Sequence, residues 1–423
     1  MIKKIKNYFN DSLFWLILSL FYFSNDSFVF GVNGDNNFFI LQYIFLIIIF
    51  TISFFKVLSV KIINKKLLLI YILFDILLIL SLAINNDSPA KYFYQIVIIG
   101  ISVITVSYND SNKLLNSLLK VIIFLSCASW IPYLTNIFLP QIANLFPTAI
   151  NTANWRFHNM IVGVAPYNEL YHSIYRNFSI FREPGVFAVF ILLGLILTLF
   201  YNNKNNTSSN IKYITILTLT MLSTLSTAGT ICYILIILFY FVSKKISKEK
   251  IMLFLILLFG CFYLVNFTDI PNRIMGKMFV ENNPSTMSRV NSIKSNLLIF
   301  IDNPILGSGW GKIDSTFQET SLNLVGSSTS YGESSFHNTN TLLRILSTHG
   351  IIYFCIYIIG FLKVFNKITN IKIINYILAI IFAIMLSNEN LTLNFCIYLL
   401  ILLGYKKERH INESSWNKFS TIW

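Results

Sequence analysis

An arginine and a glutamate stand directly before a long apolar run in the stretch SIFREPGVFAVF, residues 179–190. Pro184 suits the first turn of a helix, where its missing N–H costs nothing, and Gly185 allows another group to approach the backbone closely. A helix that begins there presents free N–H groups and its positive dipole end next to Arg182, so the stretch could bind an anion. Arg176, upstream, could supply a second guanidinium. The alternative is a capped helix with a surface Arg–Glu pair, worth at most about 1 kcal/mol.

A histidine and an arginine flank the start of another apolar run, FHNTNTLLRILSTHGIIYF. Asn338 or Thr339 is predicted to cap a helix there. Thr341 and Arg344 then follow His337 at four and seven residues, so the three side chains share one helix face. A histidine titrates near neutral pH and could take or relay a proton. The alternative is a histidine with a purely structural role.

A third stretch, RVNSIKSNLLIFIDNPILGSGWG, begins at Arg289. Its apolar residues Val290, Ile293, Leu297 and Ile301 have the spacing of a helix that lies on a membrane surface. The Gly-Ser-Gly-Trp-Gly segment that follows is rich in turn formers but lacks the pattern of a phosphate-binding loop. Any contact with phosphate must therefore come from other groups, such as arginine.

Patterns that bind a metal or mark a catalytic nucleophile are absent from the sequence. There is no HExxH, GxSxG or Cys–His zinc spacing, and the predicted outer loops contain no Asp-x-Asp pair to hold a divalent cation. We therefore expect neither a metal nor a cofactor, and arginines would take the role that a metal has elsewhere. Asp75 lies inside a predicted span, where a carboxylate can be part of a transport pathway. An equal alternative is a structural acid whose side chain snorkels to the interface or pairs with another helix. His349, deep in a predicted span, is interpreted as structural.

The elements that must position these residues are transmembrane helices. The 423 residues are 55% hydrophobic and 12% charged, with a mean hydropathy of +0.66, whereas a soluble domain has about 25% charged residues. Apolar runs of about 15 to 22 residues fit helices that cross a bilayer rather than the strands of a barrel. We predict an all-α polytopic bundle with twelve spans, at residues 8–24, 38–55, 66–84, 92–108, 116–138, 184–201, 211–225, 229–243, 250–267, 341–362, 372–387 and 391–404.

Lysines set the predicted orientation, because basic residues beside short loops resist translocation. With the N-terminus in the cytoplasm, nearly every lysine cluster lies inside, so both termini are predicted to be cytoplasmic. The net charge of +14 is then a topology signal and an attraction to anionic lipid. It is no evidence for nucleic-acid binding.

Two of the predicted outer loops are long, and loops of this length are usually functional or disordered. Six of the seven arginines lie at or beyond the outer membrane face, where their planar forks suit bidentate binding of phosphate. For any one of these arginines, the alternative is an exposed surface residue that binds no ligand. The loops divide the chain into an N-terminal bundle of five spans (1–138), a first outer loop (139–183), central spans (184–267), a second outer loop (268–340) and C-terminal spans with a cytoplasmic tail (341–423).

With these features in order, the chain resembles the Wzy-type O-antigen and capsular polysaccharide polymerases, which share a superfamily and a GT-C-like membrane architecture with the O-antigen ligases. The resemblance rests on FREPGVFAVF at the start of a helix, LSTLSTAGT in a helix pair, and then NPILGSGWG followed by FHNTNTLLRILSTHGIIYF. It covers most of the chain, although the first five spans add only topology.

The resemblance implies a glycosyltransferase of the bacterial cytoplasmic (inner) membrane that acts at the outer face, without a metal and with inversion. It would move a growing glycan from undecaprenyl pyrophosphate to a hydroxyl of a new lipid-linked repeat unit. Its partners would be the undecaprenyl-pyrophosphate-linked oligosaccharide and the lipid bilayer, with a chain-length regulator protein as an open question.

Roles for individual residues also follow from this resemblance. His337 would be the base or orienting group for the acceptor hydroxyl, with Glu183 as the alternative. The residues expected to bind pyrophosphate are Arg182, Arg176, Arg289 and Arg344. The residues expected to stack on sugar faces, unless they are interface anchors, are Trp155, Trp310 and Tyr331.

Two other functions remain open at this level. An O-antigen ligase, which transfers finished polymer to lipid A core, has a similar fold and chemistry. A flippase for lipid-linked oligosaccharides belongs to a different class and needs charges that line a cavity within the spans. The predicted spans contain few acids, and the arginines gather outside them, which favours an enzyme over a flippase.

Overall fold

The computed structural model describes residues 11–30, 36–60, 64–150, 156–166, 175–201, 207–243, 284–325 and 338–407. Within these ranges the chain is mainly helical, with one small sheet. The helices are α2 (Ser12–Tyr22), α3 (Asn36–Val60), α4 (Lys65–Asn85), α5 (Pro89–Tyr108), α6 (Ser111–Ala128), α7 (Trp130–Phe138), α8 (Pro140–Ala143), α9 (Pro184–Ile196), the π-helical turn η1 (Leu197–Tyr201), α10 (Thr207–Thr224), α11 (Thr227–Ser243), α14 (Pro284–Asp302), α15 (Gly309–Val325), α16 (Thr341–Phe365), α17 (Lys372–Leu386) and α18 (Phe395–Tyr405).

The predicted spans coincide with helices wherever the structure describes them. Eleven of the twelve fall on helices, and the remaining one, 250–267, lies outside the described residues. The prediction of a helical membrane protein is therefore confirmed, whereas twelve spans and a GT-C-like architecture stay predictions. Among the described residues, the helices long and apolar enough to cross a bilayer are Lys65–Asn85, Pro89–Tyr108, Ser111–Phe138, Pro184–Tyr201 and Thr341–Phe365.

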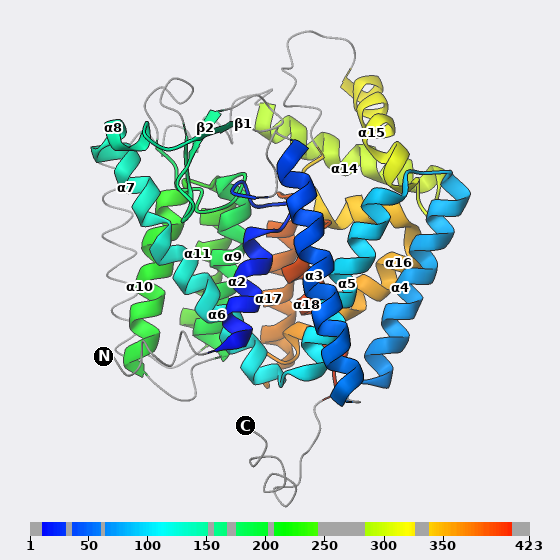
Figure 1. Ribbon diagram of the computed structural model, residues 1–423, viewed down its shortest axis with the longest axis horizontal. Coiled ribbons are helices and arrows are strands. Elements are labelled where there is room, and N and C mark those ends of the chain that lie inside the picture. Colours follow the sequence, from blue (N-terminus) through cyan, green and yellow to red (C-terminus); the bar gives the residue numbers. More distant parts are fainter. Residues whose placement is uncertain are drawn as a thin grey trace, which may run out of the picture.

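Helix α9 lies inside the bundle (Figure 1). All of its residues are buried, as expected for a helix that is apolar on every side, and α6, α10, α11 and α17 pack around it. By contrast, α3 and α4 keep large apolar side chains exposed, such as Ile52 at 62% and Leu69 at 60%. An extended apolar surface of this kind suits contact with lipid.

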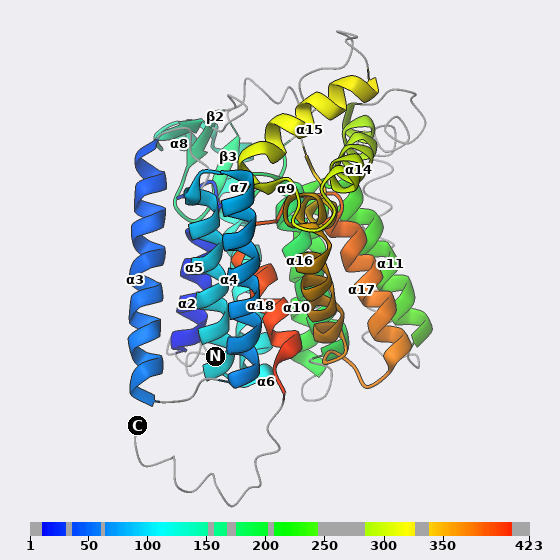
Figure 2. The same ribbon diagram turned by 90° about the vertical axis from the view of Figure 1, so that its right-hand side faces the viewer.

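The small sheet, α8, α14 and α15 lie together at one end of the bundle, which we call the loop end (Figures 1 and 2). The sheet is antiparallel in the order β1 (Thr148–Ile150), β2 (Arg156–Asn159) and β3 (Val164–Pro166). It lies in the first predicted outer loop, so the all-α prediction omitted these strands. The loop end also holds the C-terminal ends of α2, α10 and α17 and the N-terminal ends of α9, α16 and α18.

Helix α14 turns its polar side inward. Ser292, Ser295 and Asn296 are fully buried. The Ser295 hydroxyl lies 2.9 Å from that of Ser321 in α15, and Asn296 exchanges amide hydrogen bonds of 3.0 Å with Asn338. The predicted helix is therefore confirmed, while its contact with a membrane surface stays a prediction. Its exposed side carries the four apolar residues Val290 (38%), Ile293 (42%), Leu297 (40%) and Ile301 (66%).

Helix α16 begins later than predicted. Its N-cap is Asn340, whose side chain accepts a hydrogen bond of 2.9 Å from the backbone N–H three residues on. The two predicted caps are used differently, because the amide of Asn338 pairs with Asn296 and the hydroxyl of Thr339 lies 3.3 Å from that of Ser292. These two side chains thus attach the start of α16 to α14.

The segment before α15 packs backbone to backbone against a kink in α16. Gly350 interrupts the helix with φ 74° and ψ −177°, and the N–H of Ile351 donates to the carbonyl of Pro304 at 2.8 Å. A Cβ atom at Gly350 would lie 2.1 Å from the carbonyl oxygen of Ile305. The contact therefore depends on the absence of a side chain at this position.

Candidate active site

Arg182 joins three separate segments at the loop end. Its Nε donates to Asp26 Oδ1 at 3.2 Å, and its Nη2 donates to the carbonyl of Asn390 at 2.8 Å. Its Nη1 lies 3.4 Å from Glu183 Oε1, and Asp26 accepts a further hydrogen bond of 2.7 Å from Asn394. Burial opposes the charged form of the guanidinium, but the neighbouring carboxylates, above all those of Glu183 and Asp26, outweigh it and raise the pKa.

The backbone explains why Arg182 and Asp26 meet. The N–H of Arg182 donates to the carbonyl of Asp26 at 2.9 Å, and the N–H of Phe28 donates to the carbonyl of Ile180 at 2.7 Å. Ser27 and Phe181 form an antiparallel bridge between these bonds. The chain after α2 and the chain before α9 therefore run side by side, and this pairing fixes where α9 begins.

The first turn of α9 is close to a carboxyl group of the protein itself. Pro184 occupies the first turn as predicted, and Glu183 is the N-cap residue but makes no side-chain capping hydrogen bond. A Cβ atom at Gly185 would lie 1.7 Å from Oε1 of Glu389. The predicted anion site at this helix terminus is thus occupied by Glu389, and a substrate anion would have to share it.

Glu389 connects the starts of two helices. Its carboxyl group contacts α9, and its backbone carbonyl accepts hydrogen bonds from the N–H of Thr341, at 3.1 Å, and from the Thr341 hydroxyl, at the start of α16. The residue is 8% exposed. Its sequence signal is its place in the short polar stretch SNENLT between two spans. Neither Glu389 nor Asp26 was among the predicted site residues.

Charged neighbours set the titration of Glu389. Burial raises its pKa, and the carboxylate of Glu183 raises it further. Guanidinium groups oppose this shift, but the pKa still reaches about 8. The group can therefore exchange a proton near neutral pH. The opposing guanidinium groups belong to Arg182, Arg289 and Arg176.

Two of the predicted arginines approach this site from other elements. The Nε of Arg176 donates to the carbonyl of Thr224 at 3.0 Å, and its Nη2 lies 3.5 Å from the carbonyl of Leu225, at the C-terminal end of α10. Arg289 is half-buried on α14. The charges of both act on the carboxyl group of Glu389, as the charge of Arg182 does.

Arg344 is buried and belongs to an adjoining cluster. Its Nη2 donates to Asp314 Oδ1 at 2.6 Å, and Lys91 pairs with the other carboxylate oxygen at 3.1 Å. Burial raises the pKa of Asp314, but the charges of Arg344 and Lys91 outweigh it and lower the pKa below its ordinary value. The Nε of Arg344 has no hydrogen-bond partner among the residues that the structure describes.

Trp310 packs against this cluster. It is 3% exposed, its backbone N–H donates to the Tyr92 hydroxyl at 3.0 Å, and its indole N–H donates to Gln95 at 2.7 Å. Lys91 and Arg344 lie over its ring, at 5.7 and 5.6 Å from the centroid. This placement favours a positioning role for Trp310, and its contact with sugar stays a prediction.

Replacing Asp314 with asparagine is expected to loosen α15. The change removes the charge that pairs with both Arg344 and Lys91, and hydrogen exchange of α15 amides should become faster by up to about fivefold, the size expected for a half-exposed ion pair. Hydrogen-exchange mass spectrometry of the purified protein measures this. Ser315→Ala is the matched control, because its hydroxyl bonds only to a carbonyl of its own helix. Equal exchange in both variants would contradict the assignment.

The other predicted site residues are placed as follows. His337, Trp155 and Tyr331 lie outside the described residues, so their roles stay predictions. His349 is 2% exposed and lies 3.1 Å from the amide nitrogen of Gln95, which agrees with its structural interpretation. Within the described ranges, no group of three or more metal-binding side chains occurs.

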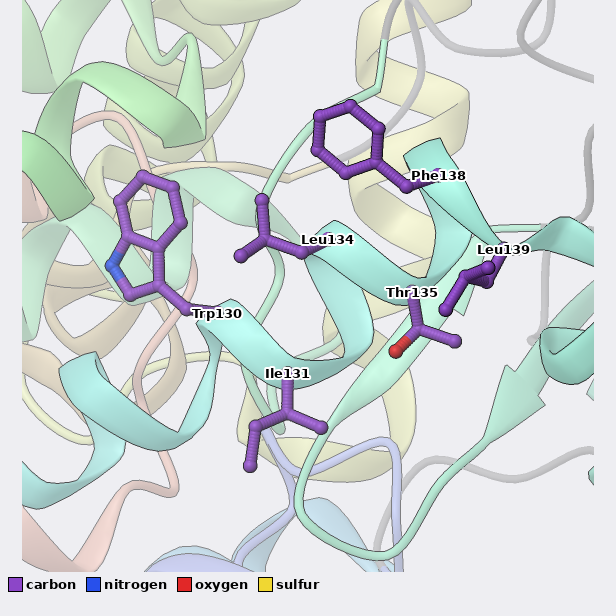
Figure 3. Close-up of a pocket in the computed structure, with 6 residues that line it drawn as sticks. All are labelled: Trp130, Ile131, Leu134, Thr135, Phe138 and Leu139. Atoms are coloured by element: carbon purple, nitrogen blue, oxygen red, sulfur yellow. The ribbon is translucent and has the colours of Figure 1, made fainter.

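An apolar hollow of about 300 Å³ lies along α7, at the loop end (Figure 3). The indole N–H of Trp130, on its wall, donates to the hydroxyl of Thr220 in α10 at 3.1 Å. Arg176 binds α10 one helical turn further on, at Thr224. The described lining residues of the hollow include no ionisable side chain. Its lining residues are Trp130, Ile131, Leu134, Thr135, Phe138 and Leu139.

Residues 213–358 match the model of the O-antigen ligase family. No curated protein matches the chain. The matched region contains Arg289 and Arg344, begins after Arg182 and ends before Glu389. It supports the resemblance to the superfamily of O-antigen ligases and polymerases, and it does not separate the two activities.

Proposed function

We propose that this protein transfers a glycan from a polyprenyl pyrophosphate carrier to a hydroxyl of an acceptor at the membrane surface. The observation that carries the proposal is the guanidinium group of Arg182, which Asp26 and Asn390 hold at the start of α9, with the buried carboxyl group of Glu389 against Gly185. The family match to residues 213–358 supports the same class of reaction.

The arrangement suits a reaction in which negative charge develops on a leaving pyrophosphate. Three of the five N–H groups of Arg182 bond to described residues, which leaves two for a ligand. The first turn of α9 adds its dipole. A preorganised donor aimed at developing charge contributes roughly 3 to 4 kcal/mol to catalysis. Arginines of this kind would stabilise the leaving group without a metal.

The proposal includes a membrane orientation. Lysine placement supports cytoplasmic termini and a loop end on the outer face of the bacterial inner membrane. Lipid-linked substrates reach such a site from the bilayer, and the hollow beside α7 is a described apolar surface near Arg176 that fits part of a lipid chain.

We favour a polymerase that adds lipid-linked repeat units, and the family match makes a ligase an equally supported second candidate. A strain that lacks this protein separates them. Accumulation of single repeat units on the carrier lipid would indicate a polymerase, whereas accumulation of finished polymer on the carrier would indicate a ligase.

Elongation of a lipid-linked repeat unit by the purified protein is expected to proceed with a chelator present, because arginines rather than a divalent cation would stabilise the pyrophosphate. Gel analysis of the products, with and without chelator, measures this. A reaction that stops in chelator and returns with added Mg²⁺ would contradict the metal-free mechanism.

A further inference from the structure

Glu389 is the acidic residue placed most deeply among the arginines of the candidate site. Its carboxyl group lies against the Cα of Gly185, and its backbone carbonyl is fixed by Thr341 at the start of α16. The Thr341 contacts fix the main chain of Glu389, and the absence of a side chain at Gly185 leaves room for the carboxyl group beside α9. Glu389 therefore lies between the starts of two helices, with its carboxyl group against the first turn of α9.

The charges around Glu389 come from every neighbouring element. Arg176, Arg182 and Glu183 precede α9, and Arg176 donates to the carbonyl of Thr224 at the end of α10. Arg289 lies on α14. Further out, Asp26 and Arg344 act on Arg182. Glu183 differs from Glu389, because its side chain is 53% exposed and is paired with Arg182.

We propose that Glu389, rather than His337 or Glu183, is the catalytic base of the transfer, an inference that rests on the proposed function. In this step the acceptor O–H proton moves to a carboxylate oxygen of Glu389, and the acceptor oxygen forms a bond to the anomeric carbon of the donor. The bond between that carbon and the phosphate oxygen breaks, and its electron pair leaves with the pyrophosphate, which Arg182 stabilises. Glu183 adjusts the basicity of Glu389 and does not accept the proton.

The titration of Glu389 fits this task. A base is most effective when its pKa lies near the working pH, and the pKa of Glu389 is about 8. The residue must be ionised to accept a proton, so the rate should rise with pH through this value. Removing the negative charge of Glu183 should lower the pKa of Glu389 and move the rise in rate to lower pH.

The test compares Glu389→Gln, Glu183→Gln and the wild type in elongation of a purified lipid-linked repeat unit across a range of pH. Glu389→Gln keeps the size of the side chain and the backbone carbonyl, and it should slow elongation by about 100-fold or more. Glu183→Gln should retain a pH-dependent rise with its midpoint shifted downward. Gly185→Ala, whose methyl group would displace the carboxyl group, should resemble Glu389→Gln.

Infrared spectroscopy provides a measurement that needs no substrate. The carbonyl band of protonated carboxylic acids should weaken in the wild type as the pH rises through about 8, and the difference between the wild type and Glu389→Gln should be the contribution of one carboxyl group. Unchanged elongation and pH dependence in Glu389→Gln, with an active wild type, would overturn the inference alone. A wild type that transfers glycan neither to a second lipid-linked repeat unit nor to lipid A core would overturn the proposed function and this inference with it.

Discussion

Arg182→Ala is expected to abolish glycan elongation and to destabilise the protein at the same time. The leaving pyrophosphate would lose two hydrogen-bond donors. Transfer should therefore become about 100-fold to 1000-fold slower. The buried Asp26 carboxylate, 6% exposed, would lose its cation. Breaking a fully buried ion pair costs roughly 3 to 5 kcal/mol, and we expect the lower end because Arg182 is 22% exposed.

A second substitution separates the two effects. Arg182→Ala combined with Asp26→Asn removes the unpaired charge, so thermal stability in detergent should recover while elongation stays absent. Asp26→Asn alone keeps Arg182 and should retain part of the activity. The glycan ladder in cells, normalised to membrane abundance, reports the activity. Recovery of elongation in the double variant would show that Arg182 acts only as a structural partner of Asp26.

Gly350→Ala is expected to cause a large loss of stability for the addition of a single methyl group. The backbone at φ 74° and ψ −177° lies in a region that only glycine adopts readily, at a cost of order 1 to 3 kcal/mol for another residue. The new methyl group would also overlap the carbonyl of Ile305, which is 2.1 Å from the Cβ position. Because both obstacles are backbone, no side-chain rotation relieves them.

Membrane abundance and thermal unfolding of the purified protein measure this effect. Cys355→Ala, an exposed position on the same helix, is the control and should be nearly neutral. Relaxation of the kink would detach Pro304 and Ile305 from α16 and disturb Trp310 and Arg344, so elongation should fall as well. A Gly350→Ala variant as stable as the control would contradict this account.

The positions of the helices could be predicted from local features. Apolar runs long enough to cross a bilayer stay helical whatever surrounds them, because the backbone in lipid must satisfy its own hydrogen bonds. Pro184 marked the start of α9 by another local rule, because a proline in the first turn loses no hydrogen bond. The cap of α16 was misplaced, since Asn338 found a partner on α14 that no local rule could supply.

The candidate site also combines features that local patterns predict with features that depend on tertiary contacts. Local patterns were enough to predict that Arg182, Arg176 and Arg289 lie outside the apolar runs, and that a helix begins next to Arg182. The pairing of Arg182 with Asp26, 156 residues away, and with Asn390, 208 residues away, depends on tertiary packing. The same packing places Glu389 in the space left by Gly185. Hydropathy fixes which segments cross the bundle, but the packing of α9 among α6, α10, α11 and α17 fixes which helix ends meet, and the chemistry lies where they meet.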